Sequence, residues 1–331
     1  MGILGLGHRA LGVGVAVVLL AGCGALSTGI TTPPATMAAS TTAKAPGSWM
    51  LSEAKNDDLL YASDDSSTVY VFAYPSLVQV GQLSGINANT QGLCVDNQGD
   101  VFVPAWTESP LNGYVFKFAH GGTKPIATLS DPNAAPSSCS VDPATGNLAV
   151  TNYDSYANAD VAVYKNGQGS PTTYATPFAP QWAAYDDNGD LFVDGLKEGS
   201  AYGELAELPS GAGSFTTIPL NKSIAMFSLQ WDNGYLTITG NQDNFESLHI
   251  YRVKVTGSGG SIVGATTLKV RRVGYGGNGQ YWIQDNRILG AGEQHRRLSI
   301  WRYPKGGRAV ATVVRNFRPW GVTISAAPSH K

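Results

Sequence analysis

The chain repeats one strand-turn-strand phrase, and this repetition constrains its fold more than any other feature. The clearest copy runs from Gly92 to Val103, and further copies occupy residues 138–150, 183–193 and 229–238. Each copy has an apolar stretch, a turn rich in Asp, Asn and Gly, and a second apolar stretch with β-branched and aromatic residues. This arrangement is typical of a β-hairpin. Recurrence along the chain indicates a repeat architecture.

A third strand and a second Gly-rich turn belong to each repeat. The expected third strands are residues 69–73, 114–118, 161–164, 204–208, 249–252 and 299–303. After five of them come Gly122, Gly169, Gly213, Gly260 and Gly307, at spacings of 47, 44, 47 and 47 residues. A fourth strand closes each unit, and four strands in about 45 residues is the pattern of a propeller blade. The sequence therefore predicts an all-β, six-bladed β-propeller.

The two ends of the repeat region are incomplete in a complementary way. The chain enters at residues 59–64, which correspond to a second strand without a first. It leaves at residues 320–325, which correspond to a first strand with nothing after it. We therefore expect the C-terminal strand to pair with the N-terminal one and close the first blade, because closure removes exposed sheet edges. Deletion of residues 319–331 is expected to unfold the domain.

The repeats resemble a known group of proteins. The stretch from Gly92 to Val103, together with Leu-Tyr-Ala-Ser-Asp at 60–64 and Val-Tyr-Val-Phe at 69–72, is similar to the NHL-repeat propellers. These belong to a broad six-bladed group with gluconolactonase-like and TolB-like domains. The resemblance covers residues 58–325 and implies the fold. The group contains scaffolds, binding proteins and enzymes, so the resemblance does not imply one function.

The N-terminus has the features of an export signal. An apolar run of 12 residues, 11–22, follows His8 and Arg9 and is too short to span a bilayer. Leu20-Ala21-Gly22-Cys23 resembles the bacterial lipobox, so we expect residues 1–22 to be a lipoprotein signal peptide and Cys23 to be lipidated. An ordinary secretory signal with an incidental cysteine is the alternative.

Composition divides the rest of the chain. Residues 23–48 are rich in Ser, Thr, Ala, Pro and Gly and predict a disordered tether, followed by the propeller at 49–326 and a short tail at 327–331. Because Gly24 rather than Asp follows Cys23, an outer-membrane location is favoured over the inner membrane. Loss of Arg9 with the signal lowers the basic count from 22 to 21 against 24 acidic residues, a net charge of −3. This balance gives no reason to expect nucleic acid. We expect a monomer anchored to the membrane, with a glycan or protein partner.

Two cysteines remain after Cys23. Cys94 lies two residues before its turn aspartate, and Cys139 lies three residues before Asp142. An offset of one residue along a strand points side chains to opposite faces of the sheet. We therefore expect two buried free thiols, although export would permit a disulfide.

No catalytic or metal motif stands out. The Asp-rich runs at 96–100 and 186–190 lack the alternating ligands and distal Glu of an EF-hand loop, and they fit turn chemistry instead. The four histidines left in the mature chain show no metal-ligand spacing: His120, His249, His295 and His330. The Glu-Gly-Pro-type motif of gluconolactonase-like enzymes is missing, since Glu53 stands in an unrelated context. We predict no catalytic residue, metal or cofactor.

The connections between strands differ on the two faces of the expected ring. Those joining first to second and third to fourth strands are short turns, whereas those joining second to third and fourth to first strands are longer and carry aromatic and Asn residues. Aromatic planes and amides suit sugar rings or an extended peptide. The expected ligand-binding residues are Trp106, Tyr153, Tyr156, Tyr202, Phe245, Tyr275, His295 and Trp320. The alternative is that these aromatics cap the blade interiors.

Two functions are consistent with these features. The first is a cell-envelope lipoprotein whose propeller binds or scaffolds without catalysis. The alternative is a propeller enzyme of the lactonase or lyase type, for which His295, Arg296 and Arg297 are the nearest candidates for charge chemistry. Convergence of acidic or His side chains with perturbed pKa values would favour the enzyme.

Overall fold

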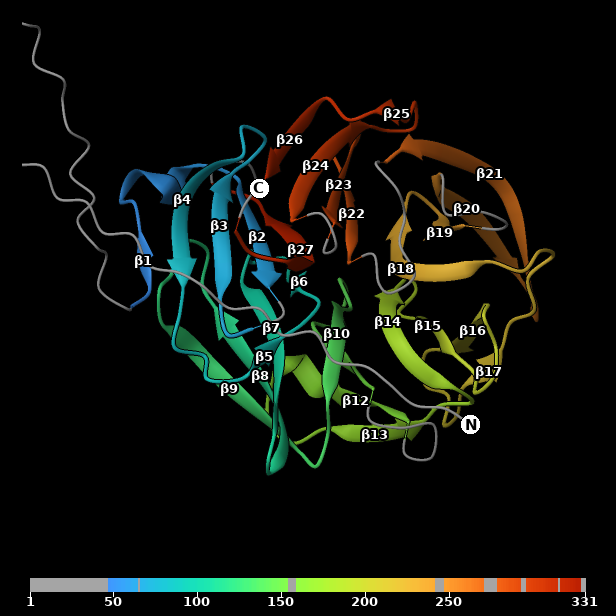
Figure 1. Ribbon diagram of the computed structural model, residues 1–331. Coiled ribbons are helices and arrows are strands. Elements are labelled where there is room, and N and C mark those ends of the chain that lie inside the picture. Colours follow the sequence, from blue (N-terminus) through green and yellow to red (C-terminus); the bar gives the residue numbers. More distant parts are fainter. Residues whose placement is uncertain are drawn as a thin grey trace, which may run out of the picture. The chain divides into compact units, whose positions relative to one another are not determined.

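The computed structural model describes residues 47–64, 66–153, 159–241, 247–270, 279–292, 296–314 and 316–328. These residues form six antiparallel sheets arranged as the blades of a ring, so the predicted six-bladed β-propeller is confirmed (Figure 1). The predicted signal peptide, residues 1–22, and the predicted lipidation site Cys23 lie outside the described residues. Within the described part, no helix is long and apolar enough to cross a bilayer. The helical segments there are two short 3-10 turns, Glu53–Asn56 and Lys165–Gly167.

Each blade runs outward from the ring axis. Blade one, from the axis outward, consists of β27 (Pro319–Ser325), β2 (Leu59–Asp64), β3 (Val69–Ala73), β4 (Val78–Leu83) and β1 (Trp49–Met50). Blade two has β5 (Asn89–Thr90) and β6 (Cys94–Val95) innermost, then β7 (Val101–Glu108), β8 (Leu111–Phe118) and β9 (Pro125–Pro132). Blade three is β10 (Pro136–Val141), β11 (Leu148–Asn152), β12 (Asp160–Tyr164) and β13 (Thr172–Ala175).

The remaining three blades follow the same order. Blade four is β14 (Ala179–Tyr185), β15 (Leu191–Leu196), β16 (Gly203–Leu208) and β17 (Thr216–Thr217). Blade five is β18 (Ala225–Asp232), β19 (Tyr235–Asn241), β20 (Leu248–Thr256) and β21 (Gly259–Lys269), extended by β25 (Gly307–Arg308), which pairs parallel to β21. Blade six is β22 (Tyr281–Gln284), β23 (Arg287–Gly292), β24 (Arg297–Arg302) and β26 (Ala311–Val314).

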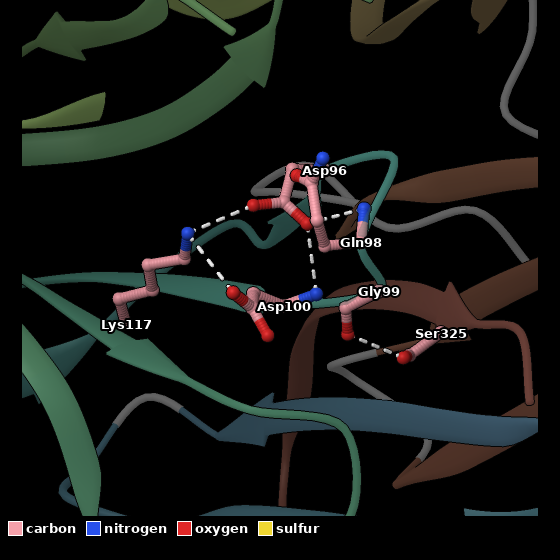
Figure 2. A network of polar contacts seen from close by, with 6 residues as sticks. All are labelled: Asp96, Gln98, Gly99, Asp100, Lys117 and Ser325. Carbon is pink, nitrogen blue, oxygen red and sulfur yellow. Dashed lines mark hydrogen bonds and ion pairs between the residues drawn. The ribbon is translucent and has the colours of Figure 1, made fainter. Parts of the chain in front are cut away.

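The C-terminal strand closes the ring as predicted. β27 pairs antiparallel with β2, with Leu60 opposite Ile324. Ser325 ties the end of β27 to blade two, because its hydroxyl donates to the Gly99 carbonyl at 2.6 Å (Figure 2) and lies 2.7 Å from His120 Nδ1. The last strand thus joins two blades as well as completing one.

Two parts of blade geometry differ from the sequence expectation. The sequence predicts a long loop between the second and third strands of blade two, over residues 106–112, but β7 and β8 continue as a paired hairpin whose turn is Ser109-Pro110. At the outer edge of blade one, β1 adds a strand beside β4, with Trp49 opposite Gln82. The closing blade therefore has five strands.

The two cysteines form a disulfide, which corrects the prediction of free thiols. Cys94 in β6 and Cys139 in β10 are joined with their Cα atoms 5.6 Å apart. Their side chains do leave opposite faces of equivalent strands. In a propeller, however, the front of one blade packs on the back of the next, so opposite faces of neighbouring blades meet. Phe102 and Val150 belong to the same buried cluster between blades two and three.

A second kind of contact joins neighbouring blades at a bulge near the loop end of the inner strands. The second-strand residue at this bulge is Ser63 in blade one, Thr151 in blade three and Asp194 in blade four. Ser63 donates to the Gln91 carbonyl of blade two at 2.5 Å, and Thr151 donates to the Gln181 carbonyl of blade four at 3.1 Å. A hydroxyl at this position therefore links a blade to the backbone of the next.

Side chains fill the middle of the ring. The Gln280 amide of blade six accepts hydrogen bonds from the backbone N–H groups of Leu93 and Val322, both at 2.9 Å, and donates to the Leu93 carbonyl at 2.8 Å. Trp182 of blade four lies against Gly92 of blade two, where a Cβ would stand 2.6 Å from the indole. Because these contacts join blades that are not neighbours, they lie close to the ring axis.

Candidate functional site

The face of the ring with the turns between first and second strands is called the turn face, and the opposite one the loop face. On the turn face, Asp96 accepts hydrogen bonds from the backbone N–H groups of Gln98 and Asp100, both at 2.9 Å (Figure 2). Asp186 accepts in the same way from Asn188 and Asp190. These carboxylates stabilise turns, as the sequence predicted. No group of three or more potential metal ligands occurs in the part of the chain that the structure describes.

Lys117 adds a charged contact to the first of these turns. Its ammonium lies 2.9 Å from Asp96 Oδ2 and 3.0 Å from Asp100 Oδ2 (Figure 2). These two ion pairs raise the pKa of Lys117 against the opposing effect of burial, which is the largest single influence. The ammonium is therefore held in place by the turn carboxylates.

On the loop face, Trp106 lies in an open groove of about 480 Å³. Three segments of two blades form it: the connection after β2, the connection after β4, and the protruding end of the β7–β8 hairpin. The lining residues are Ser66, Ser67, Asn87, Ala88, Asn89, Trp106, Thr107, Glu108 and Ser109. The groove thus combines one large aromatic ring with amides, hydroxyls and a carboxylate.

Backbone geometry fixes the polar groups around Trp106. Asn89 in β5 lies directly opposite Trp106 in the antiparallel pair with β7, which places the amide beside the indole. Asn87 is exposed and has a positive φ of 53°, a conformation that Asn tolerates better than most residues. Ser66 is held by Asp64, whose Oδ1 accepts from the Ser66 hydroxyl at 2.6 Å and from its amide at 3.0 Å.

The structure does not gather all the predicted aromatic residues into one site. Tyr153 and Tyr202 are 41% and 45% exposed and belong to the connections of blades three and four, away from the groove residues. Trp320 is half-buried and packs against the hydrophobic cluster of blades four and five. Tyr156, Phe245, Tyr275 and His295 lie outside the described residues. Trp106 is the predicted residue that the structure places in a cavity.

The loop-face ends of blades two and three bring together two buried or half-buried carboxylates, Asp131 of β9 and Asp160 of β12. The Asn152 amide donates to Asp131 Oδ2 at 2.9 Å and to Asp160 Oδ1 at 2.7 Å. Burial, together with the charge of Asp160, raises the pKa of Asp131 above its usual value, and the Asn152 hydrogen bond opposes the rise. Neither carboxylate lines the Trp106 groove or the cavity at the axis. Both carboxylates are engaged by one amide, an arrangement suited to a structural role.

A second cavity, of about 250 Å³, lies at the ring axis on the turn face, although the short Asp-rich turns of this face predict no ligand site. Inner strands of five blades line it, and Asp187 and Pro143 come from the adjoining turns. Its large aromatic residues are Tyr185, Trp231 and Trp282. A signal for it existed in the repeat, because Tyr185 and Trp231 stand at the same position, directly before the turn aspartate. Equivalent inner-strand residues gather round the axis of a propeller.

Comparison with known proteins defines the class at the level of the fold. One similar solved structure is a chain of the crystal structure of a nidogen/laminin complex, with 12% sequence identity, a TM-score of 0.58, and coverage of 82% of this chain and 98% of that chain. Another is hydrazine synthase of Kuenenia stuttgartiensis, with 12% identity, a TM-score of 0.55, and coverage of 86% and 94% respectively. No protein-family model and no curated protein matches the sequence. The chain is a six-bladed β-propeller.

Proposed function

We propose that the chain is a cell-envelope lipoprotein with a propeller of the NHL type that binds an extended ligand, a glycan or peptide, without catalysing a reaction. The observation that carries this proposal is the groove around Trp106. An indole beside Asn89 supplies stacking area and directed hydrogen bonds in one place. The open form of the groove suits a chain-like ligand that lies across the surface.

The proposed lipid anchor and the proposed binding face are both consistent with a protein that works at the cell envelope. Lipidation of Cys23 and a tether over residues 23–48 would hold the ring at a membrane, with the outer membrane favoured. A monomer with a nearly neutral surface would then meet envelope glycans or proteins and not nucleic acid. The similarity to a chain solved within a complex of two proteins supports a protein partner as one form of the ligand.

Titration of the full-length lipoprotein in detergent micelles tests the groove. The probes are N-acetylglucosamine oligomers and short unstructured peptides, and calorimetry measures their affinities. Trp106→Ala is expected to weaken binding about tenfold or more, because it removes the stacking surface. Tyr202→Ala is the control, since this tyrosine is exposed on the same face outside the groove. Equal affinities for the wild-type protein and the Trp106 variant would refute the groove as the site.

Crosslinking in intact cells tests the same site in its own surroundings. A photo-activatable residue at Thr107, in the groove, should capture the ligand, whereas one at Lys197, exposed in the blade-four connection, should not.

Replacement of Cys23 by Ala tests the lipid anchor and should release the protein from the membrane fraction. Retention of that variant in the membrane would contradict the lipid anchor while leaving the groove untested by that assay.

A further inference from the structure

The cavity at the ring axis differs from the Trp106 groove in shape and chemistry. It lies on the opposite face, and it is smaller, at about 250 Å³ against 480 Å³. Gln280 forms part of its lining, and the amide of this residue is already bonded to Leu93 and Val322. Because Gln280 is 3% exposed and lies close to the ring axis, the cavity has a closed inner end. It would hold a small molecule rather than a chain.

The amide and indole groups of the cavity wall already have partners. Gln230 donates to the Ile283 carbonyl at 3.0 Å and accepts from its amide at 2.7 Å. The indole N–H of Trp231 donates to Asp187 at 2.9 Å, and that of Trp282 donates to Gln284 at 3.3 Å. A ligand would therefore meet ring surface and not the indole N–H groups, and on Trp231 only the ring face away from Phe192.

Trp231 is fixed before any ligand arrives. Its ring stacks on Phe192 with centroids 6.2 Å apart and an interplanar angle of 4°, and its N–H is bound to Asp187. Fixing an aromatic ring beforehand lowers the entropy lost on binding. Trp282 comes from the neighbouring blade, so the two rings line the cavity from two sides of one blade interface.

The turns around the cavity are acidic. The five turns at 96–100, 142–147, 186–190, 232–234 and 285–286 contain eight Asp and no Lys or Arg. Lys117 offsets two of these carboxylates, Asp96 and Asp100. Asp187 lines the cavity itself. Burial is the main cause that raises the pKa of Tyr185 above its usual value, and the charge of Asp142 adds to the rise.

We propose that the axial cavity on the turn face binds a small organic cation of the quaternary ammonium class, with the ring faces of Trp231 and Trp282 and the carboxylate of Asp187 as its recognition elements. A cation is attracted to an aromatic face most strongly when the ring is Trp. A methylated ammonium needs no hydrogen-bond partners, which matches the occupied amide and indole groups. Its charge complements the turn carboxylates.

Calorimetric titration of the full-length lipoprotein with choline tests the proposal. The control ligand is 3,3-dimethylbutan-1-ol, which has the same shape as choline but carries carbon in place of the charged nitrogen. Choline should bind about tenfold more tightly or better, because only the cation gains the electrostatic attraction of the rings. Choline affinity should also fall with added salt, since part of the attraction comes from exposed carboxylates.

Three variants identify the residues involved. Trp231→Phe and Trp282→Phe keep an aromatic ring but weaken its attraction for a cation, so each should lower choline affinity roughly threefold to tenfold. Asp187→Asn keeps an oxygen acceptor for the Trp231 indole and removes the charge, with a similar loss expected. Trp106→Ala, on the other face, should leave choline affinity unchanged. Equal binding of choline and its neutral analogue, or no choline binding by the folded wild-type protein, would overturn the proposal.

Discussion

Replacement of Asp194 by Asn should make the propeller more stable at neutral and alkaline pH. Asp194 lies on β15 at the bulge, is 1% exposed, and its Oδ1 accepts one hydrogen bond, from the Trp182 amide at 3.2 Å. Its Oδ2 has no hydrogen-bond partner among the described residues. Burial raises the pKa of this carboxyl from 3.8 to about 8, and the Trp182 bond only partly offsets the rise. The carboxyl is therefore protonated in the folded protein at neutral pH.

The repeat explains what this proton does. Ser63 and Thr151, at the same bulge position, donate a hydroxyl to the backbone carbonyl of the next blade. In blade five the bulge lies between Met226 and Ser228, so the carbonyl equivalent to that of Gln181 is the backbone carbonyl of Phe227. We expect protonated Oδ2 of Asp194 to donate to it, in place of the hydroxyl. An Asn side chain keeps the Oδ1 acceptor and provides a permanent N–H donor at the second position.

The size of the stability change follows from the raised pKa of Asp194. In the unfolded chain the carboxyl ionises near pH 3.8, so between there and about pH 8 the folded state holds a proton that the unfolded state has released. The stability contributed by Asp194 is therefore complete below pH 3.8 and is lost as the pH rises to about 8. The slope is about 1.4 kcal/mol per pH unit, and the total is roughly 5 to 6 kcal/mol.

Urea unfolding of the wild type and of Asp194→Asn from pH 5 to pH 9, followed by tryptophan fluorescence, measures this effect. The advantage of the Asn variant should grow by about 4 kcal/mol between pH 5 and pH 8 and level off above. Asp285→Asn, which removes a carboxylate at an exposed turn, is the matched control for the substitution itself. A difference between Asp194→Asn and wild type that stays constant across this range would refute the reasoning.

Three further changes test other contacts. Replacing Cys94 and Cys139 by Ala removes a cross-link over 45 residues and should cost about 4 kcal/mol, seen as a lower urea midpoint that reducing agent does not lower further. Gln280→Ala leaves two buried backbone N–H groups without their acceptor and should cost roughly 2 to 4 kcal/mol in thermal or urea unfolding, whereas Gln168→Ala, at an exposed position, should be neutral. Deletion of residues 319–331 should abolish cooperative unfolding by circular dichroism, and a folded truncated ring would show that closure is dispensable.

The fold was predictable because the repeat carries it. Turn residues and alternating apolar stretches recur at one period, so the same blade pattern can be recognised in several copies. For example, β3 begins and ends at the expected residues Val69 and Ala73. The closing strand was predictable from the mismatch of the ends. These features depend on local pattern and on counting, which a sequence shows directly.

The contacts between blades were not predictable in the same way. The offset between Cys94 and Cys139 was read correctly as opposite faces, but the conclusion required knowing that opposite faces of adjacent blades meet. The groove depends on three segments that come together only in the folded ring, so the sequence placed Trp106 and the connection from Asn87 on the same face without showing that they are neighbours. Trp231 and Trp282 lie on the first strands of consecutive repeats, so the repeat predicts that their blades are adjacent, but not that the two side chains line one cavity.

Buried side chains close the middle of the ring, so it does not form an open channel between the two faces. Gln280 and Trp182 join blades that are not neighbours, so a solute that enters from one face has no passage through this point to the other. Occupancy of the proposed site on one face therefore leaves the proposed site on the other face vacant. Mixed titrations with the two proposed ligands should then give additive heats.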